Sequence, residues 1–150
     1  MSELDDIDKK IIDELQKNSR KPFVEIAKEI GISDPAIHGR VKKLQENGVI
    51  KQFTTILAPS KVEKDVAAFI EINTKPNNVE KVIKRLENIN DVLEIHETHG
   101  DYDLLVKLRA KSNDDLRDLV VKKIHSIPNI NNLKVTTILK TRKEKQLKLS

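Results

Sequence analysis

The sequence predicts an α+β protein in two parts, a helical N-terminal part followed by a part in which strands and helices alternate. Apolar residues recur at helical spacing three times in the first 50 residues. After residue 62, short apolar runs typical of strands alternate with two amphipathic segments. The run Ala58-Pro59-Ser60-Lys61 interrupts both periodicities and is the best linker candidate. We therefore expect domains at 1–50 and 62–150, joined by a linker strand and hinge at 51–61.

Three helices are expected in the N-terminal part. The first carries an apolar stripe of Leu4, Ile7, Ile11, Ile12 and Leu15, with aspartates at its positive N-terminal end. Pro22 can open a short second helix, and Gly31 stands where a left-handed cap would end it. Ser33 can cap a third helix that buries Ile37, Val41 and Leu44. A short helix, a glycine-containing turn and a capped helix form a helix-turn-helix.

The later elements are expected in the order β-α-β-β-α-β. Residues 49–56 resemble a strand that leads out of the helical part. The remaining strands are expected at 66–73, 92–98, 102–109 and 133–141, with helices at 79–86 and about 113–125. This order is the ferredoxin-like split motif, an antiparallel sheet backed by two helices.

Composition restricts the possible chemistry. The chain has no cysteine, which excludes disulfides, zinc–thiolate sites and cysteine nucleophiles. Its acidic N-terminus does not resemble a signal peptide, and no apolar run approaches the roughly 20 residues that span a bilayer. We therefore expect a cytoplasmic protein. A net charge of +4 permits a polyanionic partner without proving one.

Basic residues gather on the expected third helix. Residues 1–58 hold equal numbers of acidic and basic side chains, yet within 38–51 four cations face only one carboxylate. Cations suit phosphate contacts, and small or polar residues near the helix start can approach base edges. Gly39 disfavours the helix by about 1 kcal/mol relative to Ala, which suggests close approach to a partner. The alternative is an ordinary solvated face. The candidate contacts to double-stranded DNA are Ser33, Asp34, Ala36, His38, Gly39, Arg40, Lys42 and Lys43.

Two segments carry a resemblance to a known family. The run LDDIDKKIIDELQKNSRKPFVEIAKEIGISDPAIHGRVKKLQENGVIKQF is similar to the N-terminal half of Lrp/AsnC (feast/famine) regulators. The run THGDYDLLVKL resembles the turn of that family's effector domain. Together the resemblance covers the chain from Leu4 to about Arg142. It implies a sequence-specific transcription regulator, a homodimer through the second domain that often assembles to an octamer, near-palindromic operators and an amino-acid effector.

The expected turn after residue 98 has two interpretations. Gly and Asp favour a tight turn on backbone grounds alone, so GDYD can be a purely structural hairpin. The resemblance implies instead that the turn lines an effector pocket between subunits. The candidate effector contacts are then Thr98, Gly100, Asp101, Tyr102 and Asp103.

The last strand departs from the family pattern. A Thr-x-Thr pair usually faces the pocket there, whereas here Leu133 and Val135 take the apparent positions, followed by Thr136 and Thr137. A slip of one residue turns a side chain to the other face, so Thr136 is the one candidate contact, or there is none. This departure favours an alternative, an architectural DNA-binding protein without a ligand.

Catalytic and metal-binding functions are disfavoured. The four histidines have no compact ligand spacing, and neither a phosphate-binding Gly-rich loop nor a nucleophile elbow is present. We therefore expect no metal, no cofactor beyond a possible amino-acid effector, and no enzyme. A small-molecule enzyme and a pure interaction module remain as alternatives from other functional classes.

Overall fold

The computed structural model describes residues 4–149, which form two compact units. Residues 4–56 and 143–149 make up the first unit, and residues 57–142 make up the second. The expected second domain ran to residue 150, whereas the chain's last described residues group with the helical unit. Among the described residues, none of the helices is both long and apolar enough to span a membrane.

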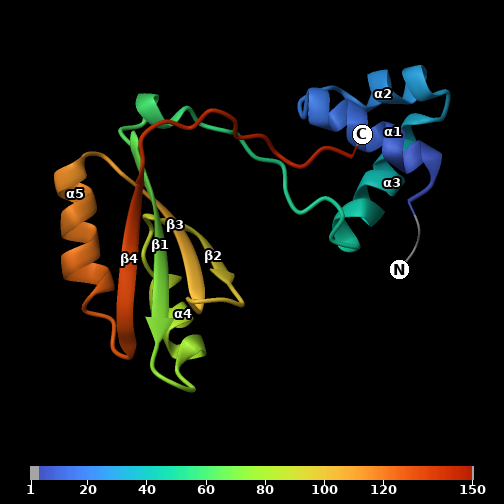
Figure 1. The fold of residues 1–150 in the computed structure, drawn as a ribbon. Coiled ribbons are helices and arrows are strands. Elements are labelled where there is room, and N and C mark those ends of the chain that lie inside the picture. Colours follow the sequence, from blue (N-terminus) through green and yellow to red (C-terminus); the bar gives the residue numbers. More distant parts are fainter. Residues whose placement is uncertain (1–3, 150) are drawn as a thin grey trace. The chain divides into compact units, whose positions relative to one another are not determined.

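The first unit contains the three expected helices, α1 (Asp6–Lys17), α2 (Phe23–Ile30) and α3 (Asp34–Glu46) (Figure 1). Gly31 ends α2 with φ +85°, a left-handed value that glycine adopts without a steric penalty. The Ser33 side chain accepts a hydrogen bond from the Ala36 N–H and caps α3. The three helices bury one apolar cluster, formed by Ile11, Ile12, Leu15, Ile26, Ala27, Ile37, Val41 and Leu44.

The strand expected at residues 49–56 is not formed, and that prediction was wrong. Residues 51–58 are exposed and adopt no regular structure. Two of their apolar side chains face solvent, Ile56 with 72% and Leu57 with 61% of their surface exposed. A strand needs a neighbouring strand to pair its N–H and C=O groups, and the four-stranded sheet formed by the described residues does not include this segment.

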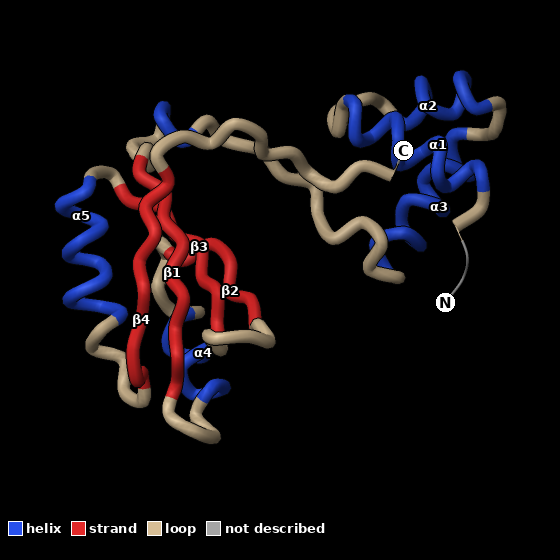
Figure 2. Tube along the Cα trace, viewed as in Figure 1, coloured by secondary structure: helices blue, strands red, loops and turns tan. Residues whose placement is uncertain are grey.

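The second unit is a four-stranded antiparallel sheet of order β2-β3-β1-β4 with helices on one side (Figure 2). Its strands are β1 (Val66–Thr74), β2 (Val92–Glu97), β3 (Leu104–Ala110) and β4 (Ile130–Ile138). Its helices are α4 (Val79–Leu86) and α5 (Asn113–Asp118), and a single short turn, η1 (Pro59–Lys61), precedes β1. This arrangement confirms the predicted βαββαβ order.

Alternation along the strands separates a buried sheet face from an open one. In β3, Leu104, Val106 and Leu108 are fully buried, while the residues between them are half-buried. The buried side chains of β1 and β3 form one core with Val82 and Leu86 of α4 and with the helical segment after β3. Both helices therefore cover the same face of the sheet, and among the described residues of the second unit no helix covers the other face.

Two element boundaries differ from the expectation. The helix expected over 113–125 is α-helical only to Asp118 and continues as a π-helical turn, η2 (Leu119–Ile124), closed by a His125 N–H to Val120 C=O bond of 2.8 Å. The last strand begins at Ile130 and ends at Ile138, three residues earlier than expected at each end. Its register with β1, which pairs Ala67 with Ile138, fixes that end because β1 begins one residue earlier, at Val66.

Candidate nucleic-acid interface and ligand-binding turn

The α3 helix has one face in the core of the first unit and one face in solvent. Ile37, Val41 and Leu44 are buried with at most 4% of their surface exposed. Gly39 follows Ile37 by two residues, which places it about 200° around the helix, at the centre of the outer face. Lys42 and Lys43 flank that outer face and are exposed. The outer face of α3, as used below, means Ala36, Gly39, Lys42 and Lys43.

Gly39 lies on a surface with open space in front of it. A Cβ added to Gly39 would meet no heavy atom within 4 Å outside its own helix backbone. Neither packing against another element nor a left-handed backbone therefore accounts for a glycine at this position. A smooth helix surface of this kind allows close approach by an external partner.

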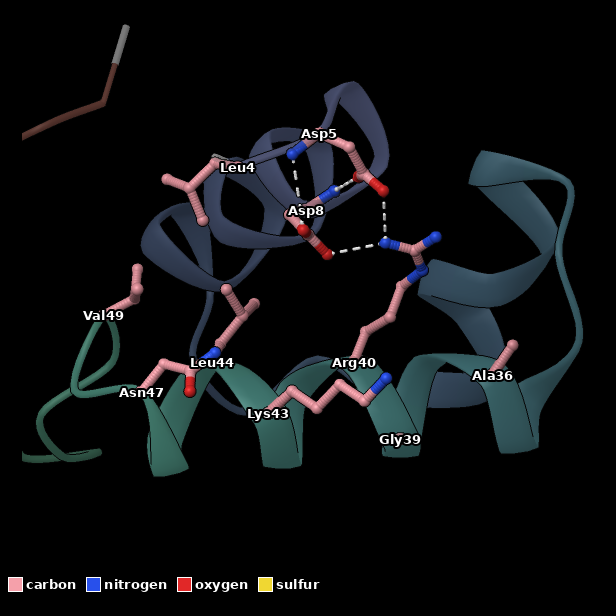
Figure 3. Close-up of a pocket in the computed structure, with 10 residues that line it drawn as sticks. All are labelled: Leu4, Asp5, Asp8, Ala36, Gly39, Arg40, Lys43, Leu44, Asn47 and Val49. Carbon is pink, nitrogen blue, oxygen red and sulfur yellow. Dashed lines mark hydrogen bonds and ion pairs between the residues drawn. The ribbon is translucent and has the colours of Figure 1, made fainter. Parts of the chain in front are cut away.

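The cations of the outer face have weak partners or reach into solvent. The Lys42 Nζ lies 3.8 Å from a Glu46 carboxylate oxygen, and 76% of the Lys42 side chain is exposed. An exposed pair at this separation contributes little, so Lys42 can exchange Glu46 for another anion. Lys43 is also exposed and extends along the surface of α3 in Figure 3.

His38 is held beside α2. Its ring packs edge-on against the ring of Phe23, with 4.7 Å between the centroids and 70° between the planes. Its Nε2 lies 3.7 Å from a carboxylate oxygen of Asp34, one helical turn earlier. The side chain is nevertheless 61% exposed, so His38 and Asp34 border the outer face and are not part of the core.

Arg40 turns away from the outer face, toward the start of α1 (Figure 3). Its Nη1 lies 2.7 Å from Asp5 Oδ2 and 2.8 Å from Asp8 Oδ1. The two aspartates raise the pKa of the Arg40 guanidinium above its ordinary value. Sequence reasoning placed Arg40 with Lys42 and Lys43 and missed both aspartates, although Asp5 and Asp8 have the spacing of a helix N-cap and its N3 residue.

The 98–103 turn is held together by its own hydrogen bonds. The Thr98 hydroxyl donates to the Tyr102 carbonyl at 2.6 Å, and the Thr98 N–H donates to the Asp103 carbonyl at 2.9 Å. The Asp103 carboxylate accepts from the N–H and the hydroxyl of Thr74 at 2.7 and 3.1 Å. Thr98 and Asp103 therefore shape the turn, whereas Gly100 and Asp101 are exposed at its tip.

Thr136 does not lie beside this turn within one chain. It pairs with Phe69 in the middle of β1, whereas the turn is bound to Thr74 at the end of that strand. Five residues of strand separate the two points, or about 16 Å. Thr136 shares the open sheet face with Phe69, and Thr137 faces the helices, where it lines a shallow groove with Leu116 and Val120.

Among the described residues, histidines and carboxylates meet in pairs or small ion networks. His96 lies 3.1 Å from Glu94, whose other oxygen lies 3.3 Å from the Lys107 ammonium. These two contacts, that with His96 above all, lower the pKa of Glu94. Within residues 4–149, no group of three or more His, Cys, Asp or Glu side chains is placed to hold a metal ion.

Comparison with known proteins assigns a family to each part of the chain. Residues 4–45 match the AsnC-type helix-turn-helix domain, and residues 67–147 match the Lrp/AsnC ligand binding domain. The chain is 39% identical over 141 residues to the HTH-type transcriptional regulator FL11 of Pyrococcus furiosus, covering 94% of this chain and 93% of that protein.

Two further relatives cover nearly the whole chain. The regulatory protein AsnC of Haemophilus influenzae is 37% identical over 131 residues, 87% of each chain. The solved structure of AsnC from E. coli superposes with a TM-score of 0.93 at 28% identity, over 98% of this chain and 99% of that one. The chain therefore belongs to the Lrp/AsnC family, and it is a transcriptional regulator with an N-terminal helix-turn-helix DNA-binding domain.

Proposed function

We propose that the outer face of α3 enters the major groove of an operator, with Lys42 and Lys43 on phosphates and with Ala36 and Gly39 against base edges. The observation that carries this proposal is Gly39, a helix-weakening residue with open space in front of its Cα. Ser33 caps the start of the helix, and His38 and Asp34 border its outer face; we include all three as candidate contacts to DNA. A recognition helix reads bases through its N-terminal residues, which fits this placement.

The salt dependence of DNA binding distinguishes contacts to phosphates from other contacts to DNA. Each lost phosphate contact lowers the slope of log K against log salt by about 0.9. We expect Lys42→Gln and Lys43→Gln each to lower the slope by about that amount for an operator selected by the wild-type protein from random duplexes. Lys10→Gln, which removes an exposed cation of α1, is the matched control and should leave the slope unchanged. Equal slopes for all three variants would contradict the proposed face.

We further propose that the second unit binds a small amino acid at the tip of the 98–103 turn. Asp101 offers a carboxylate for the ligand's ammonium group, and the exposed backbone around Gly100 offers N–H groups for its carboxylate. The family description of residues 67–147 as a ligand binding domain supports a ligand here. Tyr102 is half-buried beneath the tip and would bound the pocket.

The same proposal places the site between copies of the chain. About 16 Å of strand separates Thr136 from the turn, so a pocket that includes both needs the turn of one copy and the open sheet face of another. The open face offers half-buried Phe69 and Leu105, bordered by ion pairs such as Glu71 with Lys134 at 3.2 Å. We infer a cytoplasmic homodimer through this face, able to assemble further to an octamer, without catalysis.

Calorimetric titration with single amino acids tests the ligand site. We expect heat of binding for at least one amino acid, lost in Asp101→Asn and kept in Asp114→Asn, an exposed carboxylate at the start of α5. Light scattering on the same samples reports the assembly, and Phe69→Glu should shift it toward the monomer.

An architectural, ligand-independent DNA-binding protein is the second candidate. The distance of Thr136 from the turn favours it, because within one chain the two sets of residues do not meet. It predicts no heat with any amino acid and nearly equal affinity for selected and scrambled duplexes.

A further inference from the structure

Four carboxylate oxygens at the start of α1 divide their bonds evenly between a helix cap and Arg40. Asp5 Oδ1 accepts from the Asp8 N–H at 2.8 Å, and Asp8 Oδ2 accepts from the Asp5 N–H at 3.4 Å. This reciprocal pair is a capping box. The remaining oxygens, Asp5 Oδ2 and Asp8 Oδ1, both bind Arg40 Nη1 (Figure 3).

Arg40 lies on the flank of α3 and not on its outer face. It follows Ile37 by three residues and Ala36 by four, so it lies between the buried stripe and the outer face. Only 31% of the Arg40 side chain is exposed, compared with 76% of Lys42. Arg40 lines a hollow of about 440 Å³ between α3 and the start of α1, together with Ala36, Gly39 and Lys43 of the outer face.

A move of Arg40 to a DNA phosphate would separate it from two anions. Asp5 and Asp8 would then stand without their cation beside a polyanion, where like charges repel. The arginine would exchange two charge-assisted bonds for one or two of the same kind. Lys42, by contrast, would give up an exposed pair with Glu46 at 3.8 Å, and Lys43 is already exposed to solvent.

From this geometry we propose that Arg40 is a positioning residue, which fixes α3 against the N-terminus of α1 and so sets the angle at which α3 meets DNA. It binds neither a phosphate nor a base. This inference rests on recognition of DNA by α3, and it replaces the sequence-based expectation that groups Arg40 with the phosphate-binding lysines. Asp5 and Asp8 join it as positioning residues.

The sign of the effect of Asp8→Asn separates the two roles. If Arg40 positions α3, loss of the Asp8 charge loosens α3 and lowers the ratio of operator affinity to scrambled-duplex affinity. If Arg40 instead contacts a phosphate and Asp8 restrains it, the same change frees the arginine and removes a charge that repels DNA. Operator affinity then rises, and the ratio of operator affinity to scrambled-duplex affinity is unchanged or higher.

Fluorescence anisotropy on the full chain, with the selected operator and a scrambled duplex at several salt concentrations, performs the test. We expect Arg40→Gln and Asp8→Asn each to lower the affinity ratio by roughly fivefold or more, the effect of about one mismatched base pair. The double variant should be no worse than the more severe single variant, because both remove one interaction. The salt slope should stay at the wild-type value.

Two controls accompany the test. Asp6→Asn removes a charge from the same helical turn, where the Asp6 side chain is 93% exposed. This variant should leave the ratio of operator affinity to scrambled-duplex affinity unchanged. When Lys43→Gln is combined with Asp8→Asn, their effects on the free energy of operator binding should be additive.

A salt slope lowered by about 0.9 in Arg40→Gln, or an affinity ratio maintained in Asp8→Asn, would overturn the proposal. If Arg40→Gln melts below the assay temperature, Asp8→Asn alone decides, since asparagine keeps a capping oxygen. Failure of DNA recognition itself would appear as equal wild-type affinity for both duplexes.

Discussion

The outer face of α3 and the 98–103 turn are both polar, but their polar groups are used differently. On α3, Lys42 and Lys43 extend into solvent beside an open glycine surface. In the turn, the side chains of Thr98 and Asp103 bind the chain itself. The proposed DNA-binding face thus consists of groups open to solvent, whereas in the turn hydrogen bonds within the chain occupy Thr98 and Asp103 and leave the tip exposed. Charge alone does not distinguish a binding residue from a structural one, and the partners of each group do.

The strongest way to separate the two regions is to remove the core beneath one of them. Ile37 is fully buried in the first unit, and Ile37→Ala should lower the free energy of unfolding of that unit by about 2–5 kcal/mol. DNA binding should be lost while assembly of the second unit persists. Denaturant titration with light scattering checks both. Ile70→Ala, in the core of the second unit, should instead destabilise that unit and disrupt assembly, while the first unit stays folded. Loss of both units together in either variant would contradict two independent cores.

Asp103 and Asp101 should respond differently to the same substitution. Asp103→Ala leaves two donors of Thr74 without their acceptor and should destabilise the second unit by about 1–3 kcal/mol. Asp101→Ala removes an exposed carboxylate and should change stability by less than about 0.5 kcal/mol while abolishing the heat of ligand binding. Thermal unfolding and calorimetry distinguish the pair, and equal loss of stability would refute the division of roles.

Gly39 tests the outer face in the opposite direction. Gly39→Ala should stabilise the first unit by about 1 kcal/mol, because alanine favours helix and meets no neighbour. Operator affinity should nevertheless fall, since the added methyl group occupies the space we assign to DNA. Gln45→Ala, at an exposed position near the end of α3, is the control for helix propensity alone. Increased stability with unchanged affinity would show that DNA does not approach Gly39.

The smallest effect concerns pH and the end of α1. Hydrogen bonds from Lys17 and then Lys21 lower the pKa of Glu14 to about 2 from an ordinary value of 4.5. A lowered carboxyl pKa stabilises the fold above the unfolded value, so this contribution is present above pH 4.5 and lost as pH falls toward 2. The melting temperature should therefore fall less between pH 4.5 and 2 in Glu14→Gln than in the wild-type protein. The difference should be modest because Lys17 is 71% exposed. Glu25→Gln on α2 should keep the wild-type profile.

Local signals in the sequence were sufficient for the three helices of the first unit. Caps and apolar spacing specify α1, α2 and α3 because each signal lies within a few residues of the element it bounds. The strand at 49–56 was wrongly predicted for the complementary reason: a short segment rich in apolar residues can be a strand, but its sequence does not show that a partner strand exists. The start of β4 was missed because Asn131 and Asn132 disfavour strands, and the strand continues through them because Asn132 pairs with Asn73 and Ile130 with Thr74 of β1.

For the candidate sites as well, local features could be predicted from the sequence and distant partners could not. Helical spacing correctly places Gly39, Lys42 and Lys43 opposite the buried stripe. The same spacing puts Arg40 on the flank, but its partners in α1 lie more than 30 residues away, where no local pattern reaches. Likewise, the composition of the turn could not reveal that Asp103 is bound to Thr74.

We expect one chain to combine sequence-specific DNA recognition with a response to a small amino acid. The most direct test is anisotropy of wild-type protein with its selected operator and a scrambled duplex, at two salt concentrations, with and without a pool of amino acids. We predict a preference for the operator that persists at the higher salt concentration and shifts when the pool is added. Equal binding to both duplexes, weakening together with salt and unchanged by the pool, would contradict the claim.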